Sequence, residues 1–338
     1  MDLQVTWFVL LVVLFVGYAV LDGFDLGVGM LHFTAKTDKE RRVLLNSIGP
    51  VWDANEVWLI TAGVALFAAF PDVYATVFSG FYIAFMLFLL AIIGRAVSIE
   101  FRSKVDSVKW KKVWDFVFHF SSYLIVLLLG LTLGNIVSGL PIDADKEFLG
   151  TFLGLFNPYS VYVAVTAVLL IRLQGRLFLL NKTEGELFDR ILKRFKLQWL
   201  IFILVYIGLT IWTILGQSRL LFNYNHNGAL YLIPVLSYFS VILIYLFVQT
   251  QKYYPAFFAS CLVIALSVIQ AGIGIFPNLL PSNPIPENSL TIFNSSSSET
   301  TLYTMFIIAC IGIPLVIVYK FIMYTVFRGK VKLDSTSY

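Results

Sequence analysis

The chain has 338 residues, of which 59% are hydrophobic and only 13% are charged, whereas about 25% of the residues of a soluble globular protein are charged. This composition excludes a water-soluble protein. It predicts an all-α polytopic membrane protein, because several apolar runs exceed the ~18 residues that mark a membrane-spanning helix. The formal net charge of +4 has to be read separately for each side of the membrane and does not indicate a nucleic-acid partner.

Apolar runs predict about nine transmembrane helices. In chain order they cover residues 5–31, 51–70, 73–94, 113–139, 157–180, 197–217, 228–249, 255–276 and 301–327. No basic residue precedes the first run, and the run contains Asp22 and Asp25. We therefore interpret it as a helix of the mature protein and not as a signal peptide.

Basic residues predict the orientation of these helices. If the N-terminus lies outside, all of the 24 Lys and Arg residues except Lys146 and Arg219 fall on the inner side. Short cytoplasmic loops retain basic residues during insertion. We therefore expect an odd number of spans, with the N-terminus outside and the C-terminus in the cytoplasm.

The chain is predicted to divide near residue 150, where an acidic outer segment precedes the fifth span and a basic loop follows it. Residues 1–150 would form a four-helix transmembrane unit that carries the acidic motifs, and residues 151–338 a second unit of five spans. The outer loop at about 277–300 is rich in Pro and Ser, which predicts irregular structure. Cys261 and Cys310 lie in separate apolar runs and indicate neither a disulfide framework nor a metal site.

Four carboxylates lie inside predicted helices, where a charged side chain costs ~2.5–3.5 kcal/mol near the bilayer centre. Asp22 and Asp25 are three residues apart in the first span, and Asp53 and Glu56 repeat this spacing in the second, so each pair shares one helical face. Both pairs are predicted to lie toward the cytoplasmic end. In the first span, glycines at small-residue spacing would let a neighbouring helix approach closely; they are Gly23, Gly27 and Gly29.

Further polar residues are predicted at the same depth. Arg95 and Glu100 come at the end of the third span, and Asp115 and His119 at the start of the fourth. Such groups in neighbouring helices are what a proton relay or an ion path needs. Alternatively, they pair to lock the helices or extend to interfacial water. We favour this alternative for Arg95, Glu100 and Asp115, and the relay for the four carboxylates, which lack an equal number of basic partners.

The histidines do not predict a haem held by this chain, since haem needs axial His, Met, Cys or Tyr ligands. His32 lies in an inner loop, His119 in the fourth span and His226 in an outer loop, so no bis-histidine pair is expected. A single ligand from His119 stays open, although a buried, hydrogen-bonded histidine is favoured. No metal site, phosphate-binding Gly loop, nucleophile triad or HExxH motif is present.

Three segments resemble subunit II of the cytochrome bd-type quinol oxidases. The first is GYAVLDGFDLGVGML at residues 17–31, and the second is NSIGPVWDANEVWL at residues 46–59. The third combines FSGFY at residues 78–82 with Arg95 and with FRSK at residues 101–104. The resemblance to this family implies two four-helix bundles plus one peripheral helix, in a bacterial cytoplasmic membrane.

The resemblance also implies a heterodimer in which a larger subunit ligates haem b and haem d and this chain ligates no haem. The complex would oxidise quinol and reduce dioxygen to water with protons from the cytoplasm, creating a membrane potential without pumping. A small single-helix accessory subunit and a structural quinone occur in some relatives. Proton-path residues are expected at Asp22, Asp25, Asp53, Glu56, Arg95 and Glu100, and oxygen-access or interface residues at Trp52 and Trp58.

Two other functions remain open from the residues alone. A proton-coupled secondary transporter would place its binding site near the midplane at broken helices, whereas the carboxylates here are predicted toward one face. A purely structural membrane partner would use the same carboxylates only to hold helices together.

Overall fold

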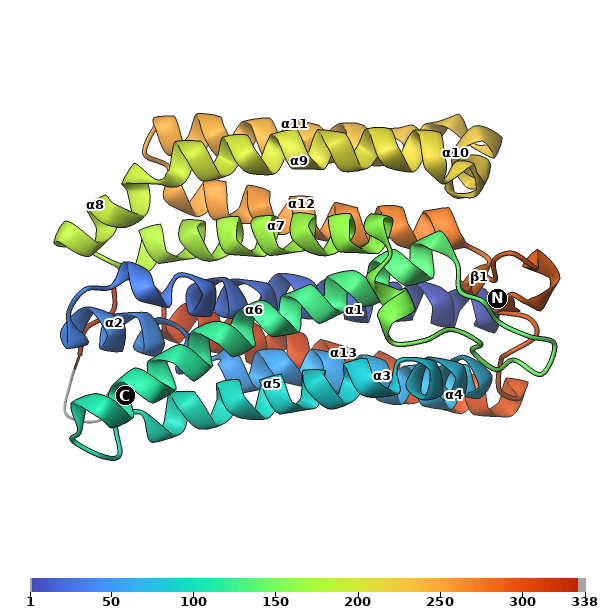
Figure 1. Ribbon diagram of the computed structural model, residues 1–338, viewed down its shortest axis with the longest axis horizontal. Coiled ribbons are helices and arrows are strands. Elements are labelled where there is room, and N and C mark those ends of the chain that lie inside the picture. Colours follow the sequence, from blue (N-terminus) through green and yellow to red (C-terminus); the bar gives the residue numbers. More distant parts are fainter. Residues whose placement is uncertain (1, 334–338) are drawn as a thin grey trace.

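The computed structural model describes residues 2–333, and the last five residues of the predicted second unit lie outside this range. Long helices run alongside one another in an elongated bundle, and the N-terminus and the last described residues lie at opposite ends of it (Figure 1). The α-helices are α1 (Leu3–Met30), α2 (Asp38–Ile48), α3 (Trp52–Ala69), α4 (Pro71–Gly80), α5 (Tyr82–Phe101), α6 (Val108–Ser138), α7 (Pro158–Lys182), α8 (Gly185–Lys193), α9 (Phe195–Gly216), α10 (Phe222–His226), α11 (Leu232–Gln249), α12 (Tyr253–Ile275) and α13 (Glu299–Val326).

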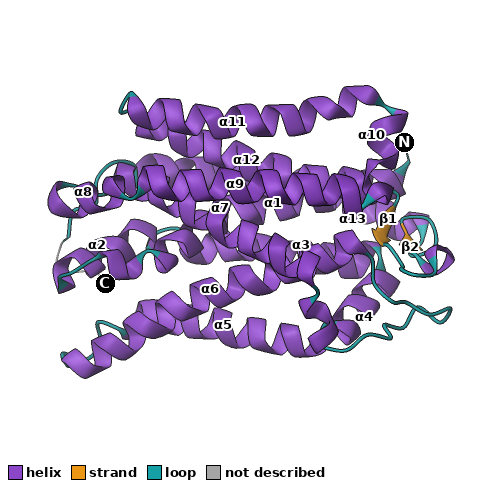
Figure 2. Cartoon of the chain, turned by 45° about the horizontal axis from the view of Figure 1, so that its top comes forward, coloured by secondary structure: helices purple, strands orange, loops and turns teal. Residues whose placement is uncertain are grey.

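Short elements occupy the connections. The 3-10 helices are η1 (His32–Thr34), η2 (Leu153–Phe156), η3 (Ser218–Leu221), η4 (Gly228–Tyr231) and η5 (Pro286–Asn288). In the predicted irregular loop, β1 (Asn278–Leu280) pairs antiparallel with β2 (Leu290–Thr291). This loop is therefore more ordered than its Pro and Ser content indicates. It lies at the same end of the bundle as α4 and the N-terminus (Figures 1 and 2).

The predicted all-α membrane fold is confirmed, and the predicted number of nine transmembrane helices is approximate. Within residues 2–333, eight helical segments are long and apolar enough to cross a membrane. The predicted span that is missing from these eight is the second one, 51–70, which corresponds to α3, whose 18 residues include Asp53, Asn55 and Glu56 at the N-terminal end. These polar residues lower its mean hydropathy, although the helix packs against α1 and α13.

The predicted span 73–94 is wrong in its boundaries. The apolar run is broken after α4 ends at Gly80, and α5 then continues from Tyr82 to Phe101. A hydropathy window averages across such a break and cannot detect it. As a result Arg95, which directly follows the predicted span, lies inside α5 and is fully buried.

Helix α1 is at the centre of the bundle and contacts α3, α6, α7 and α12. Its contact with α7 is backbone against backbone: a Cβ atom on Gly27 would lie 2.4 Å from the carbonyl oxygen of Ile171 and 2.7 Å from the Cα atom of Gly175. A Cβ on Gly23 would meet Gln174 of α7, and one on Gly29 would meet Ser122 of α6. These glycines therefore set the distance between α1 and its neighbours. The division near residue 150 stays a prediction.

Candidate functional site

A buried arginine joins three helices. Arg95 of α5 donates from Nη2 to Asp22 Oδ1 at 2.7 Å and from Nη1 to Asp22 Oδ2 at 3.0 Å. The same Nη1 donates to Glu56 Oε1 of α3 at 2.8 Å. Arg95 and Asp22 are fully buried, and the Glu56 side chain is 15% exposed. A guanidinium that holds one carboxylate with both nitrogens and contacts a second fixes both in place.

The predicted position of Arg95 at the end of its span is therefore wrong. The missed helix break had placed it near the end of a span, whereas the structure puts it at the centre of the ion network. The two acids of each predicted pair also have different surroundings: Asp22 contacts Arg95, and Asp25 contacts Asn55.

Asp25 belongs to a second polar chain, which leads to the C-terminal helix. Asn55 of α3 donates from Nδ2 to Asp25 Oδ2 at 2.7 Å and to the carbonyl oxygen of Leu21 at 3.1 Å. The Oδ1 atom of Asn55 accepts from Lys320 Nζ at 2.6 Å and from Tyr324 Oη at 3.0 Å. The sequence predicts Lys320 only as a basic residue of the cytoplasmic end, but it is buried, and its helix α13 packs against α1 and α3.

Asp53 differs from the other three carboxylates because it is exposed on the surface of the chain. It lies in the first turn of α3, where the helix dipole favours an anion. Within residues 2–333 its side chain forms no hydrogen bond or ion pair. Further along the same face of α3 the exposed residues are apolar: Val57, Ile60, Val64 and Phe67.

The other predicted site residues lie around this network. Trp52 is buried at the start of α3, and Trp58 packs across α1 so closely that a Cβ atom on Gly17 would lie 2.3 Å from the indole ring. Glu100 is half-buried near the end of α5.

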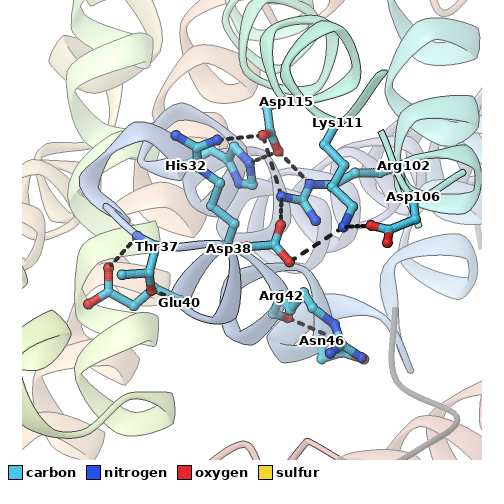
Figure 3. A network of polar contacts seen from close by, with 11 residues as sticks. His32, Thr37, Asp38, Glu40, Arg42, Asn46, Arg102, Asp106, Lys111 and Asp115 are labelled. Atoms are coloured by element: carbon cyan, nitrogen blue, oxygen red, sulfur yellow. Dashed lines mark hydrogen bonds and ion pairs between the residues drawn. The ribbon is translucent and has the colours of Figure 1, made fainter. Parts of the chain in front are cut away.

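A second ion network lies at the end of the bundle that carries α2 (Figure 3). Asp115 of α6 is fully buried, and its carboxylate contacts three basic residues. His32 Nε2 lies 2.6 Å away, Arg41 Nη1 2.7 Å and Arg102 Nε 2.6 Å. Arg102 also donates to Asp38 Oδ1 at 2.8 Å. Sequence reasoning missed this network, because its members come from four separate segments of the chain.

The second network fixes the segment that leads into α3. It joins η1, α2 and α6 to the residue that follows α5, and Glu40 of α2 also binds Arg190 of α8. Burial lowers the pKa of His32 more than its hydrogen bond with Asp115 raises it. Burial would raise the pKa of Asp38, but the hydrogen bond and the charge of Arg102 outweigh this and lower it. The network thus anchors α2, after which the chain turns directly into the helix that carries Asp53.

The histidines of this chain do not fit a haem with two axial histidines. His32 is fully buried with its Nε2 atom on Asp115, and His119 directs Nδ1 to the carbonyl oxygen of Gly29 at 3.0 Å. His226 is exposed at the end of α10. Within residues 2–333, no group of three or more His, Cys, Asp or Glu residues is arranged to hold a metal ion.

Comparison with known proteins places the whole chain in one family. The sequence model described as "Cytochrome bd terminal oxidase subunit II" matches residues 3–327. The chain belongs to this family. It is 34% identical to cytochrome bd-I ubiquinol oxidase subunit 2 of Escherichia coli K12 over 364 aligned positions, which cover 98% of this chain and 96% of the relative.

A second relative and a solved structure agree with this family. Cytochrome bd ubiquinol oxidase subunit 2 of Bacillus subtilis strain 168 is 39% identical, with 96% of each chain covered. A chain in the structure of bd oxidase from Geobacillus thermodenitrificans has the same fold, with a TM-score of 0.80 at 17% identity, over 97% of this chain and 99% of that chain. The chain is thus an integral bacterial membrane protein of a terminal oxidase family, and the transporter alternative loses its support.

Proposed function

We propose that this chain is the non-haem subunit of a quinol:dioxygen oxidoreductase and that its carboxylates deliver cytoplasmic protons for the reduction of dioxygen to water. The partner would be a larger subunit that holds haem b and haem d, as the relatives named ubiquinol oxidase subunit 2 support. Quinol is the proposed electron donor. A structural quinone and a small single-helix accessory subunit remain proposals that rest on the family alone.

The observation that carries the proposal is the position of Asp53 relative to the buried network. Asp53 is exposed in the first turn of α3, and Glu56 lies one turn further into the same helix. Glu56 in turn contacts Arg95, which contacts Asp22. A proton relay needs successive groups within hydrogen-bonding distance or linked by single water molecules. We infer the order Asp53, Glu56 and Asp22 for this path, with water between Asp53 and Glu56, while the guanidinium of Arg95 stays protonated and holds Glu56 and Asp22 in place.

The balance of charge favours a conducting role over a purely structural one. Within the described residues, the cations beside the four carboxylates are Arg95, which contacts Asp22 and Glu56, and Lys320, which is linked to Asp25 through Asn55. Carboxylates in excess of cations are an unfavourable way to lock helices, whereas a carboxylate without its own counter-ion can accept and release a proton. Glu100 stays a candidate for the path at the end of α5.

The exposed face of α3 supports a partner subunit at this point. An ionisable side chain within a membrane helix is costly when it faces lipid. The partner would cover Val57, Ile60 and Val64, with Asp53 at the cytoplasmic edge of this contact, where the proton enters. Trp52 and Trp58 are then proposed as interface or oxygen-access residues of the same helix.

The proposal includes the orientation of the chain in the membrane. Basic residues lie at the end of the bundle that carries α2 and α8, as Lys36, Lys39, Arg190 and Lys193 do. We infer that this end faces the cytoplasm and that the loop with β1 and β2 faces outward. Asp53 would then lie near the cytoplasmic surface, where protons enter.

Replacement of Asp53 tests this function. Asp53→Asn keeps the shape of the side chain and removes its titratable group, so turnover should fall at least about tenfold while haem content per complex stays normal. Oxygen consumption with quinol and haem per complex are measured on the same purified sample. Full activity would remove Asp53 from the path, and a parallel loss of haem and activity would assign it to assembly. Glu299→Gln, at an exposed position at the start of α13, is the matched control.

A further inference from the structure

Helix α13 is attached to the bundle mainly at two points. Of its 28 residues only Leu302 and Lys320 are buried, and most of its other side chains are exposed apolar residues. Leu302 is near the start of the helix, where its carbonyl oxygen accepts a hydrogen bond from Trp7 at 2.9 Å. Lys320 is near the other end. A lysine as one of two buried residues in an apolar helix is costly unless its charge is used.

The contacts of Lys320 determine the orientation of one amide. An ammonium group can only donate hydrogen bonds, so the atom of Asn55 that lies 2.6 Å from Lys320 Nζ is the acceptor Oδ1. Tyr324 donates to this same oxygen at 3.0 Å. The Nδ2 group of Asn55 is therefore directed to Asp25 Oδ2 at 2.7 Å. An amide donor at this distance requires an acceptor oxygen, which an ionised carboxylate presents at both of its oxygens and a protonated one at its carbonyl oxygen.

We propose that Lys320 is a positioning residue that, through Asn55, orients Asp25 and favours its ionised form beside the Arg95 network. The relevance of this inference to turnover rests on the proposed function. Asp25 lies on α1 one helical turn from Asp22, which belongs to the proposed proton path. The positive charge of Lys320 also acts on Asp25 directly through the buried surroundings. Removal of this charge should make Asp25 take up a proton at higher pH.

Several other groups act on Asp25 and have to be held constant in the test. These groups are Asp22 on the same helix α1, Arg95 on α5, and Tyr324 beside Lys320 on α13. Helix α3 contributes the charges of Asp53 and Glu56 close to Lys320 and Asp22. Helix α12 contributes the thiol of Cys261, which lies near Tyr324 and Gln174.

The experiment uses the complete oxidase and an infrared signal of Asp25. The C=O stretching band of a protonated carboxylic acid is followed against pH, and the part that is absent from Asp25→Asn is assigned to Asp25. In Lys320→Met the midpoint pH of this band should rise by about one unit or more, the size of effect that a nearby opposite charge has. Lys320→Arg keeps the charge and should restore the midpoint.

Tyr324→Phe is the matched control, because Tyr324 donates to the same oxygen of Asn55 and carries no charge. Its midpoint should stay close to that of the wild type. If Lys320→Met does not assemble, Lys320→Gln keeps a donor for Asn55 without the charge, and it should give the same upward shift.

Two results would overturn the inference. One is an Asp25 band that titrates alike in the wild type and in the assembled Lys320→Met or Lys320→Gln variant, which would leave Lys320 with the docking of α13 alone. The other is an equal shift in Tyr324→Phe, which would assign the effect to hydrogen bonding. Failure of the proposed function is a separate result, since it is read from oxygen consumption in Asp53→Asn, whereas this inference is read from the infrared titration of Asp25 in the Lys320 variants.

Discussion

Replacement of Arg95 should have the largest effect of any single change in the buried network. In Arg95→Leu, Asp22 loses both of its hydrogen bonds to the guanidinium, at 2.7 and 3.0 Å, and Glu56 loses the one at 2.8 Å. The side chain of Asp22 is 1% exposed, so water cannot replace these bonds without a rearrangement of α1. Two carboxylates would remain buried without their cation.

The expected cost follows from this burial. Removal of one partner of a buried ion pair destabilises a protein by about 3–5 kcal/mol, because the remaining charge is uncompensated. Glu56→Gln removes a single charged contact from a side chain that is 15% exposed, so we expect at most about 1–2 kcal/mol. Adding Asp22→Asn to Arg95→Leu removes one of the uncompensated charges and should recover part of the loss.

Thermal denaturation of the purified complex, together with haem content per complex, measures this series. The expected order of decreasing stability is wild type, Glu56→Gln, the double variant and Arg95→Leu. Equal stability of Glu56→Gln and Arg95→Leu would contradict the reasoning, since it would mean that burial of the charge does not decide the cost. A double variant that is less stable than Arg95→Leu would also refute it, because the loss would then come from packing.

The remaining predictions concern the second network and the orientation. Because burial lowers the pKa of His32, the unfolded chain binds more protons than the folded chain below the ordinary histidine value of about 6.5, so stability should fall as the pH drops through this range. His32→Asn should reduce this acid-side loss in melting temperature, and an unchanged pH dependence would show that His32 does not titrate on unfolding. Tags inserted in the 277–300 loop should react with impermeant reagents from outside the cell, and tags after Lys332 only from inside. The reverse pattern would invert the proposed side of proton uptake.

The general fold could be predicted from the sequence because apolar runs of transmembrane length have few other structures available. The break between α4 and α5 could not, since Gly80 and Phe81 lie in a run that is apolar on both sides. This break moved the predicted third span by several residues and changed the interpretation of Arg95. The polar character of α3 was visible in the sequence, and only its hydropathy kept it outside the eight apolar helices.

The sequence predicts the carboxylates of the candidate site, but it does not predict which basic residues lie beside them. Asp22, Asp25, Asp53 and Glu56 stand out because a charge in an apolar run is costly wherever the chain folds. Their partners depend on which helices become neighbours, and this information is not local. The sequence indicates Lys320 as a residue of the inner side and His32 as a loop histidine. Their buried partners, Asn55 and Asp115, could not be predicted, because each lies far away in the sequence.

The contact between Asn55 and Lys320 spans 265 positions in the sequence, and this separation has a consequence for biosynthesis. The ribosome completes α1 and α3 long before α13, so Asp25 and Asn55 enter the membrane while the cation that faces them has not yet been made. During this interval the nascent chain carries a carboxylate inside the bilayer that only water, a proton or an assisting protein can compensate. Insertion of the last helix ends this state, and chains interrupted before Lys320 would retain it.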